Sequence, residues 1–172
     1  MKLARTLLAA AAASAALASV ANAADLLTPV PITDAPLFDF EGMYVGGTAG
    51  LAWGGSAAGT LGVVVGNNFA LTDGIIAGVE FQGDAYFSGG GWSGYDALAL
   101  GRIGGFASDN TMIYGELGVG LASGTPVYAL GAGLEMAMTD QIGLRGEVQG
   151  LGAFGSTPSV GKATAGLIWH LD

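Results

Sequence analysis

The sequence of 172 residues has no cysteine and few basic residues. Without cysteine the chain can form no disulfide, no thiolate metal site and no thiol nucleophile. Lysine and arginine number 5 against 14 aspartates and glutamates, which gives a formal net charge of −9. This balance argues against a nucleic-acid partner, because binding to a phosphate backbone depends on clustered positive charge.

Beyond its first 23 residues the chain also lacks the long apolar runs of membrane helices, although its mean hydropathy of +0.55 is positive. The longest uncharged stretch, residues 42–72, contains nine glycines and the pair Asn67-Asn68. Glycine and asparagine are poor helix formers, so this stretch is unsuited to a spanning helix. An apolar, glycine-rich, exported chain without helix signals is typical of a membrane β-barrel.

The N-terminus has the three parts of a secretory signal peptide. A basic start (MKLAR) precedes an alanine-rich apolar run (TLLAAAAASAALASV), and small residues follow (ANA). This pattern predicts a cleaved signal peptide over residues 1–23 and a mature chain that begins at Ala24. The alternative, a membrane-anchoring helix, needs a longer run with less alanine. Residues 24–41 contain three prolines and predict an extended periplasmic linker.

Residues 42–172 alternate apolar and polar side chains with a period of two, which is typical of β-strands. Eight strands are predicted, near residues 43–53, 60–71, 75–87, 96–107, 113–121, 128–136, 142–149 and 162–171. The segment 96–107 fits less well, because Arg102 shares a face with Leu98 and Leu100. The pattern predicts an all-β fold, an eight-stranded antiparallel up-and-down transmembrane β-barrel.

A repeated sequence unit marks one end of the barrel. NFALTDGIIAGVEFQG (68–83) is nearly repeated as EMAMTDQIGLRGEVQG (135–150), and a weaker copy lies between them. In each copy an aspartate precedes a glutamate by seven residues: Asp73 and Glu80, Asp109 and Glu116, Asp140 and Glu147. Aspartate favours turns, so tight periplasmic turns are predicted at 72–74, 108–111 and 139–141. Looser outer loops are expected to alternate strictly with them.

Charge density decides which face of the barrel meets lipid. A soluble barrel would place its charges outside, and roughly a quarter or more of its exterior would be charged. From Gly42 onward only 13 of 131 residues are charged, so the apolar face is expected to meet lipid. The polar face then carries the lumen charges Glu80, Asp84, Arg102, Glu116, Glu135, Arg145, Glu147 and Lys162. A structural plug of ion pairs is favoured over a proton relay or a channel lining, because eight strands enclose little more than their own side chains.

Hairpins centred on the turn aspartates predict particular pairs in the lumen. Around Asp109, Arg102 and Glu116 are equidistant, and around Asp140 the same holds for Glu135 and Arg145. Both pairs bring opposite charges together. Glu80 has no charged partner opposite it, so Lys162 across the lumen is expected to pair with it.

Catalytic and cofactor signals are weak. His170 is the only histidine and lies at the predicted periplasmic end, whereas Ser88, Ser93, Ser123 and Ser156 lie near the outer rim. A His–Ser catalytic pair is therefore not expected. No metal-ligand spacing occurs, and the glycine-rich stretches lack the features of phosphate loops, so no metal and no cofactor are predicted. Aromatic residues in the outer loops suit an interfacial girdle or, alternatively, recognition: Trp53, Trp92 and Tyr128.

Four segments resemble the small porin-like outer-membrane β-barrel family of alphaproteobacteria: FEGMYVGGTAG, NNFALTDGIIAGVE, GRIGGFASDNTMIYGELGVG and ATAGLIWHL. The resemblance covers the signal, the linker and nearly all of the barrel. It implies an envelope protein, often without a defined reaction, whose last strand is recognised by barrel-assembly machinery. It also implies covalent attachment of Ala24 to peptidoglycan.

The favoured function is a structural outer-membrane barrel of a Gram-negative bacterium that contributes to envelope integrity and contacts lipopolysaccharide. The alternatives are a narrow porin for small solutes, a lipid-modifying enzyme and an adhesin, against which the short outer loops count.

Overall fold

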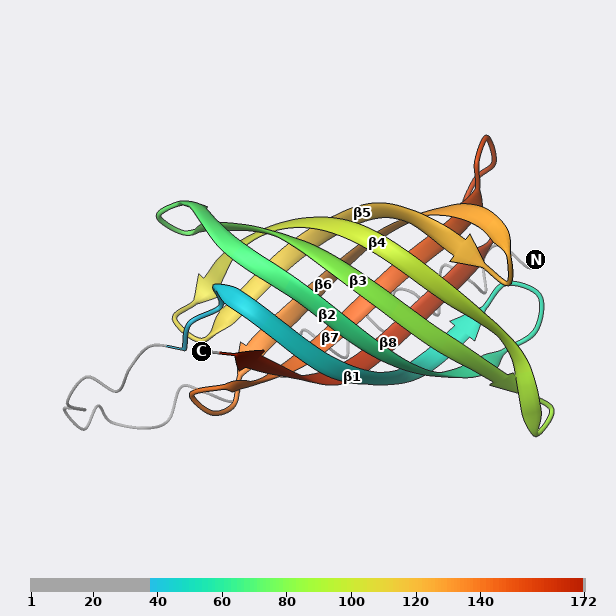
Figure 1. Cartoon of the computed structure of the whole chain (residues 1–172), viewed down its shortest axis with the longest axis horizontal. Coiled ribbons are helices and arrows are strands. Elements are labelled where there is room, and N and C mark those ends of the chain that lie inside the picture. The colour runs from blue at the N-terminus through green and yellow to red at the C-terminus, as the bar shows by residue number, and fades with distance from the viewer. Residues whose placement is uncertain (1–37, 172) are drawn as a thin grey trace. The chain divides into compact units, whose positions relative to one another are not determined.

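The computed structural model describes residues 38–171, which form eight β-strands. Their bounds are β1 (Gly42–Trp53), β2 (Ala58–Thr72), β3 (Ile75–Ser88), β4 (Gly91–Ser108), β5 (Thr111–Ala122), β6 (Thr125–Ala137), β7 (Ile142–Ala153) and β8 (Val160–Leu171). Each strand pairs antiparallel with its neighbours in sequence, and β1 closes the ring against β8 (Figure 1). The predicted eight-stranded up-and-down barrel is confirmed.

The predicted signal peptide (1–23), Ala24 and linker residues up to 37 lie outside the described residues. The last linker residues, 38–41, are described and pack at one end of the barrel. Within residues 38–171, no helix is long and apolar enough to span a membrane.

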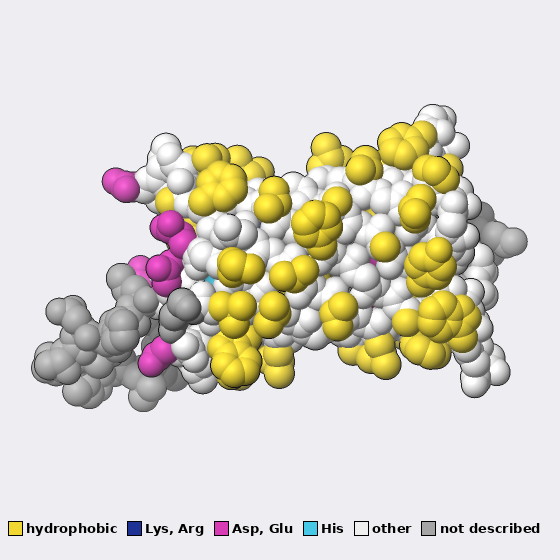
Figure 2. Space-filling view, viewed as in Figure 1, with side chains coloured by type: hydrophobic (Ala, Val, Ile, Leu, Met, Phe, Trp, Pro, Cys, Tyr) yellow, Lys and Arg dark blue, Asp and Glu magenta, His cyan; other side chains and the backbone are white. Residues whose placement is uncertain are grey.

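The alternation along each strand separates an apolar exterior from a polar interior. In β8, Lys162 and His170 are buried, whereas Leu167 is exposed. Large apolar side chains cover the outer wall (Figure 2), and Val63 and Leu117 are 68% and 65% exposed. Because successive side chains of a strand point to opposite faces, the closed ring places one polar set around its axis. This inside-out arrangement suits a hydrocarbon surrounding.

The hairpin register is the one that the turn aspartates predict. Arg102 lies opposite Glu116 on β4 and β5, and Glu135 lies opposite Arg145 on β6 and β7. Glu80 lies opposite Gly66. The backbone register therefore follows from counting residues away from each turn.

The irregular pattern of residues 96–107 has a structural cause. Leu98 and Leu100 point into the barrel together with Arg102, and both leucines are 3% exposed. They pack against Val127, Ala129 and Leu151. An apolar layer in the lumen thus separates Asp96 from Arg102 along β4, and β4 alternates regularly once this layer is recognised.

The predicted strict alternation of short and long connections is wrong. Two expected outer loops are two-residue turns, Gly89-Gly90 between β3 and β4 and Ser123-Gly124 between β5 and β6. All four residues have positive φ, between 48° and 87°, which is the geometry of type I′ hairpin turns and favours glycine. The glycine-rich composition thus makes tight turns here. The longer connections among the described residues, 54–57, 138–141 and 154–159, occur at both ends.

Candidate functional site

The barrel interior contains all eight charged residues that the sequence places in the lumen, each at most 7% exposed: Glu80, Asp84, Arg102, Glu116, Glu135, Arg145, Glu147 and Lys162. The structure adds Asp96, which the sequence reasoning missed. The sequence could have revealed it, because Asp96 and Arg102 lie an even number of positions apart and therefore on the same face of β4. In total six carboxylates and three cationic side chains are buried in the described barrel.

Glu80 is the centre of the larger ionic cluster. Its Oε2 accepts hydrogen bonds from the Tyr44 hydroxyl at 2.6 Å and from Arg145 Nη1 at 2.6 Å. Arg102 Nη1 donates to the same oxygen at 3.3 Å. These donors come from β1, β7 and β4, so the Glu80 carboxylate links strands on opposite sides of the ring.

Glu135 forms the second half of this cluster. Its Oε2 accepts from Arg145 Nη2 at 2.9 Å and from Arg145 Nε at 3.1 Å. Its Oε1 lies 2.6 Å from His170 Nε2. The predicted Glu135–Arg145 pair is therefore present, and Arg145 bridges Glu135 and Glu80.

Two tyrosine rings flank the guanidinium groups. The Arg102 Cζ lies 4.7 Å from the ring centroids of both Tyr44 and Tyr114. The Arg145 Cζ lies 5.1 Å and 5.7 Å from the same centroids. Cation–π attraction at these distances adds to the ion pairs.

Lys162 belongs to a separate cluster, so the expected Lys162–Glu80 pair is wrong. Lys162 Nζ lies 2.6 Å from Asp84 Oδ2 and 3.0 Å from Asp96 Oδ2, and the Tyr86 hydroxyl also donates to Asp96. Glu80 is four residues from Asp84 along β3, which corresponds to about 13 Å of strand. The carboxylates of Glu80 and Asp84 thus lie at different depths in the barrel, and Lys162 reaches only Asp84.

Arg102 and Glu116 are register partners that do not form an ion pair. Arg102 extends instead to Glu80, and its Nε donates to Asn68 Oδ1 at 3.0 Å. Glu116 Oε1 accepts from Gln149 Nε2 at 2.7 Å. Long side chains reach past their cross-strand neighbours toward the axis, where partners from distant strands are equally close. The predicted contact is wrong although the predicted register is right.

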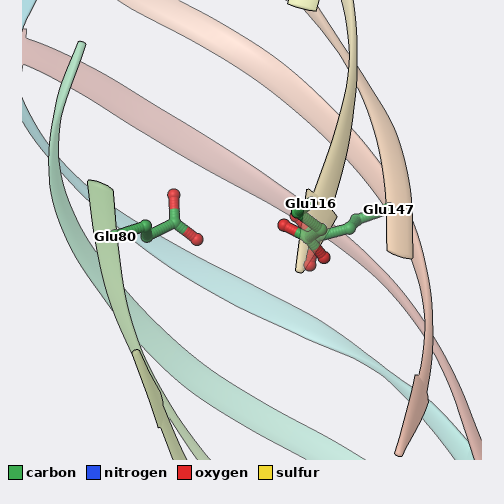
Figure 3. A group of neighbouring side chains, drawn as sticks. All are labelled: Glu80, Glu116 and Glu147. Carbon is green, nitrogen blue, oxygen red and sulfur yellow. The ribbon is translucent and has the colours of Figure 1, made fainter. Parts of the chain in front are cut away.

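The last carboxylate of the interior, Glu147, accepts a hydrogen bond from the Tyr114 hydroxyl at 2.8 Å. Glu80, Glu116 and Glu147 come from β3, β5 and β7 and approach one another around the axis (Figure 3).

The residues before β1 close one end of the lumen. Phe40 is 1% exposed and packs with Ile76, Met112 and Tyr114. Its carbonyl accepts a hydrogen bond from Asn68 Nδ2 at 2.7 Å. The Phe38 ring lies 4.6 Å from Phe40 and 4.8 Å from His170. Aromatic rings therefore cover the ionic cluster from this side.

The single histidine and the predicted outer serines lie at opposite ends of the barrel. His170 sits beside Phe38 and Glu135. Ser88, Ser93 and Ser123 line a depression of ≈ 300 Å³ at the other rim, where Tyr86 also lies. The described residues thus bring no serine hydroxyl to His170, and the arrangement supplies no nucleophile–base pair there.

Exposed charge is confined to one end of the described barrel. Acidic side chains cluster beside the turn ends in Figure 2; the exposed charged residues are Asp39, Glu41, Asp73, Asp109 and Asp140. The connections at the opposite rim, 54–57, 89–90, 123–124 and 154–159, contain no charged residue.

That uncharged rim carries the predicted aromatic residues. Trp53 and Trp92 are 42% and 66% exposed. Trp92 packs with Phe87, at 6.4 Å between ring centroids, and the Tyr128 hydroxyl donates to the Ser156 carbonyl at 2.7 Å. Exposed aromatic rings at the end of an apolar wall suit a membrane interface.

No protein-family model matches the chain, and no curated protein matches its sequence. Solved structures do resemble it. De novo designed transmembrane β-barrels match with 17% identity and a TM-score of 0.52, over 74% of this chain and 92% of theirs. Neisserial surface protein A matches with 12% identity and a TM-score of 0.50, over 75% and 96%. The fold is that of an outer-membrane β-barrel. The attachment invasion locus protein Ail of Yersinia pestis is also similar, with 12% identity and a TM-score of 0.49 over 73% and 93%.

Proposed function

We propose that the protein is a structural β-barrel of the Gram-negative outer membrane that contributes to envelope integrity and does not conduct. The observation that carries this proposal is a lumen crossed by ion pairs between distant strands. Arg145 on β7 contacts Glu80 on β3, and Lys162 on β8 contacts Asp84 on β3. These bridges span the interior, so the side chains fill the path that a solute would take.

Barrel width supports the same conclusion. Eight strands enclose an interior just wide enough for side chains, and here the interior contains tyrosines, arginines and leucines at once. Phe40 closes the end beside the turns. A solute would have to displace buried, hydrogen-bonded charges, and breaking a buried pair costs about 3–5 kcal/mol.

Conductance of the refolded mature chain in planar bilayers tests the proposal. We expect no steady openings from the wild type. The double variant Arg102→Ala/Arg145→Ala removes both guanidinium groups from the lumen and is expected to produce openings. Leu117→Ala, which changes only the outer wall, is the matched control and should stay closed.

Steady openings of the wild type would refute the plugged barrel and favour a narrow porin for small solutes. The observation that favours this second candidate is the depression at the uncharged rim, which serine hydroxyls line. The excess of carboxylates in the lumen would then make such a pore prefer cations. The lipid-modifying enzyme has less support, because His170 and the rim serines lie at opposite ends.

The acidic end, which carries the aspartate turns and residues 38–41, is proposed to face the periplasm. This orientation agrees with the resemblance to the alphaproteobacterial porin-like family and with recognition of β8 by barrel-assembly machinery. The outer rim lacks charged residues in its connections, so contact with lipopolysaccharide is proposed to run through aromatic and apolar side chains such as Trp92.

Peptidoglycan is proposed as a partner of the N-terminus through Ala24, which lies outside the described residues. The 18 residues of segment 24–41 could reach roughly 55 Å at about 3.1 Å per residue. Mass spectrometry of lysozyme-digested envelopes should find a muropeptide on Ala24. A free amine at every Ala24 would end this part of the proposal.

A further inference from the structure

We propose that the barrel interior binds one divalent, oxygen-preferring cation, best matched by Ca²⁺, between Glu80, Glu116 and Glu147. This inference goes beyond the structural function proposed above and does not depend on whether the barrel conducts. It rests on the geometry of the three carboxylates, on oxygens without partners and on the charge balance of the interior.

The three side chains converge from three strands. Each offers a carboxylate oxygen, and these oxygens lie within 4.8 Å of one another. Figure 3 shows the Glu80 carboxylate extending from β3 toward those of Glu116 and Glu147. All three residues are buried, at 1%, 7% and 6% exposure. Like charges held this close away from water repel strongly unless something positive lies between them.

Three buried oxygens in this group have no hydrogen-bond partner among the described residues. Two of them are Glu80 Oε1 and Glu116 Oε2. The known donors to Glu80, including Arg145, all bind its other oxygen, Oε2. A third orphan acceptor is Gln149 Oε1, which belongs to an amide whose nitrogen is 2.7 Å from Glu116. Buried polar atoms are almost always paired, so three unpaired acceptors around one group of carboxylates indicate a bound cation.

The charge balance agrees. Four buried carboxylates, Glu80, Glu116, Glu135 and Glu147, share the larger cluster with only two guanidinium groups, those of Arg102 and Arg145. Among these six groups, two negative charges have no counter-ion. One divalent cation would neutralise them. Among the described residues neither arginine forms an ion pair with Glu116 or Glu147, and both arginines leave Glu80 Oε1 free.

Ligand chemistry and size select the ion. Carboxylate and amide oxygens are ligands of hard cations such as Ca²⁺ and Mg²⁺. Ca–O distances of about 2.3–2.6 Å place opposite ligand oxygens roughly 4.6–5.2 Å apart, whereas Mg–O distances of about 2.0–2.1 Å limit them to roughly 4.2 Å. Oxygens spread over as much as 4.8 Å therefore accept Ca²⁺ without rearrangement. Sequence spacing gave no metal signal because each ligand lies on a different strand.

The test uses the full mature chain refolded into detergent micelles with calcium chloride or with EDTA. We expect one calcium per chain after desalting, measured by elemental analysis. At a calcium concentration a hundred times the dissociation constant, the ratio of folded to unfolded chain in a urea titration should rise about 100-fold. Magnesium at the same concentration should have a smaller effect.

Two variants locate the site. Glu116→Gln/Glu147→Gln preserves shape but removes two ligand charges, so it should bind no calcium and unfold identically with and without the ion. Asp96→Asn removes a buried carboxylate from the Lys162 cluster and should keep the full calcium response.

Two results would overturn the proposal. One is a wild type that neither retains calcium nor responds to it, which would mean that protons neutralise the carboxylates. The other is a double variant that still responds. Should the double variant fail to fold, terbium luminescence of the wild type decides, because terbium replaces calcium at oxygen sites. Tyrosine-sensitised emission that calcium displaces is expected, since Tyr114 contacts Glu147, and its absence would also refute the site.

Discussion

A double-mutant cycle on Arg145 and Glu135 tests the lumen network most directly. The Arg145 guanidinium donates two hydrogen bonds to Glu135 Oε2, at 2.9 and 3.1 Å, and both side chains are at most 2% exposed. Replacing Arg145 by alanine strands Glu135 and Glu80 without their main donor. Breaking a buried pair in this way lowers the free energy of unfolding by about 3–5 kcal/mol.

The expected coupling follows from that loss. In a Glu135→Ala background part of the penalty has already been removed, so Arg145→Ala should cost less there than in the wild type. We expect a coupling energy of about 1.5–3 kcal/mol, within the range for residues in one ion-pair network. The assay is urea unfolding in detergent followed by fluorescence of the three tryptophans.

Arg102 and Glu116 provide the comparison cycle. They are opposite one another in the register but have different partners, so their coupling energy should be clearly smaller than that of Arg145 and Glu135. Additivity of Arg145 and Glu135 would refute the network described for the lumen. Equal coupling in both cycles would show that backbone register, and not side-chain contact, sets the energetics.

Three further predictions concern the closure, the wall and the strand packing. Phe40→Ala should lower the free energy of unfolding in a urea titration by about 3–5 kcal/mol, because it removes a buried aromatic ring. Phe69→Ala on the exposed wall should cost much less, and similar losses for both variants would contradict the closure of the lumen by Phe40. Leu117→Arg places a charge on the outer wall and should cost about 2–4 kcal/mol near the midplane, measured by refolding into lipid vesicles; a neutral effect would argue against a lipid-facing wall. Gly118→Ala brings a methyl group within 2.1 Å of the Ala99 carbonyl and should prevent folding. Unboiled samples of the variant should then lack the band of folded protein on a detergent gel, and a folded band like that of the wild type would contradict this close approach.

The interior shows where sequence reasoning worked and where it failed. The lumen charges could be assigned from parity alone, because a closed sheet has only two faces and the exterior tolerates little charge. Asp96 obeys the same parity as Arg102, and it was missed because Leu98 and Leu100 made β4 look irregular. Apolar residues were expected outside, yet the lumen accommodates an apolar layer beside its ion pairs.

The prediction of the connections between strands failed for another reason. Glycine-rich stretches such as residues 88–94 have the composition of loops, but positive φ at Gly89 and Gly90 makes them tight hairpin turns. Composition cannot distinguish the two, because both depend on the conformational freedom of glycine. Whether such a stretch forms a loop or a tight turn depends on how far the flanking strands continue to pair.

The sequence by itself determined the number of strands, their faces and the hairpin register, since each of these depends on neighbours along the chain and on a period of two. Only the tertiary structure decided the partners of the buried charges. Lys162 pairs with Asp84 and not with Glu80, and Arg102 passes Glu116 to reach Glu80. These contacts join strands that are not adjacent, so they depend on the depth of each side chain and its reach across the ring. The alternation of residues along one strand predicts neither the depth nor the reach of a side chain, because both are set by the closed barrel.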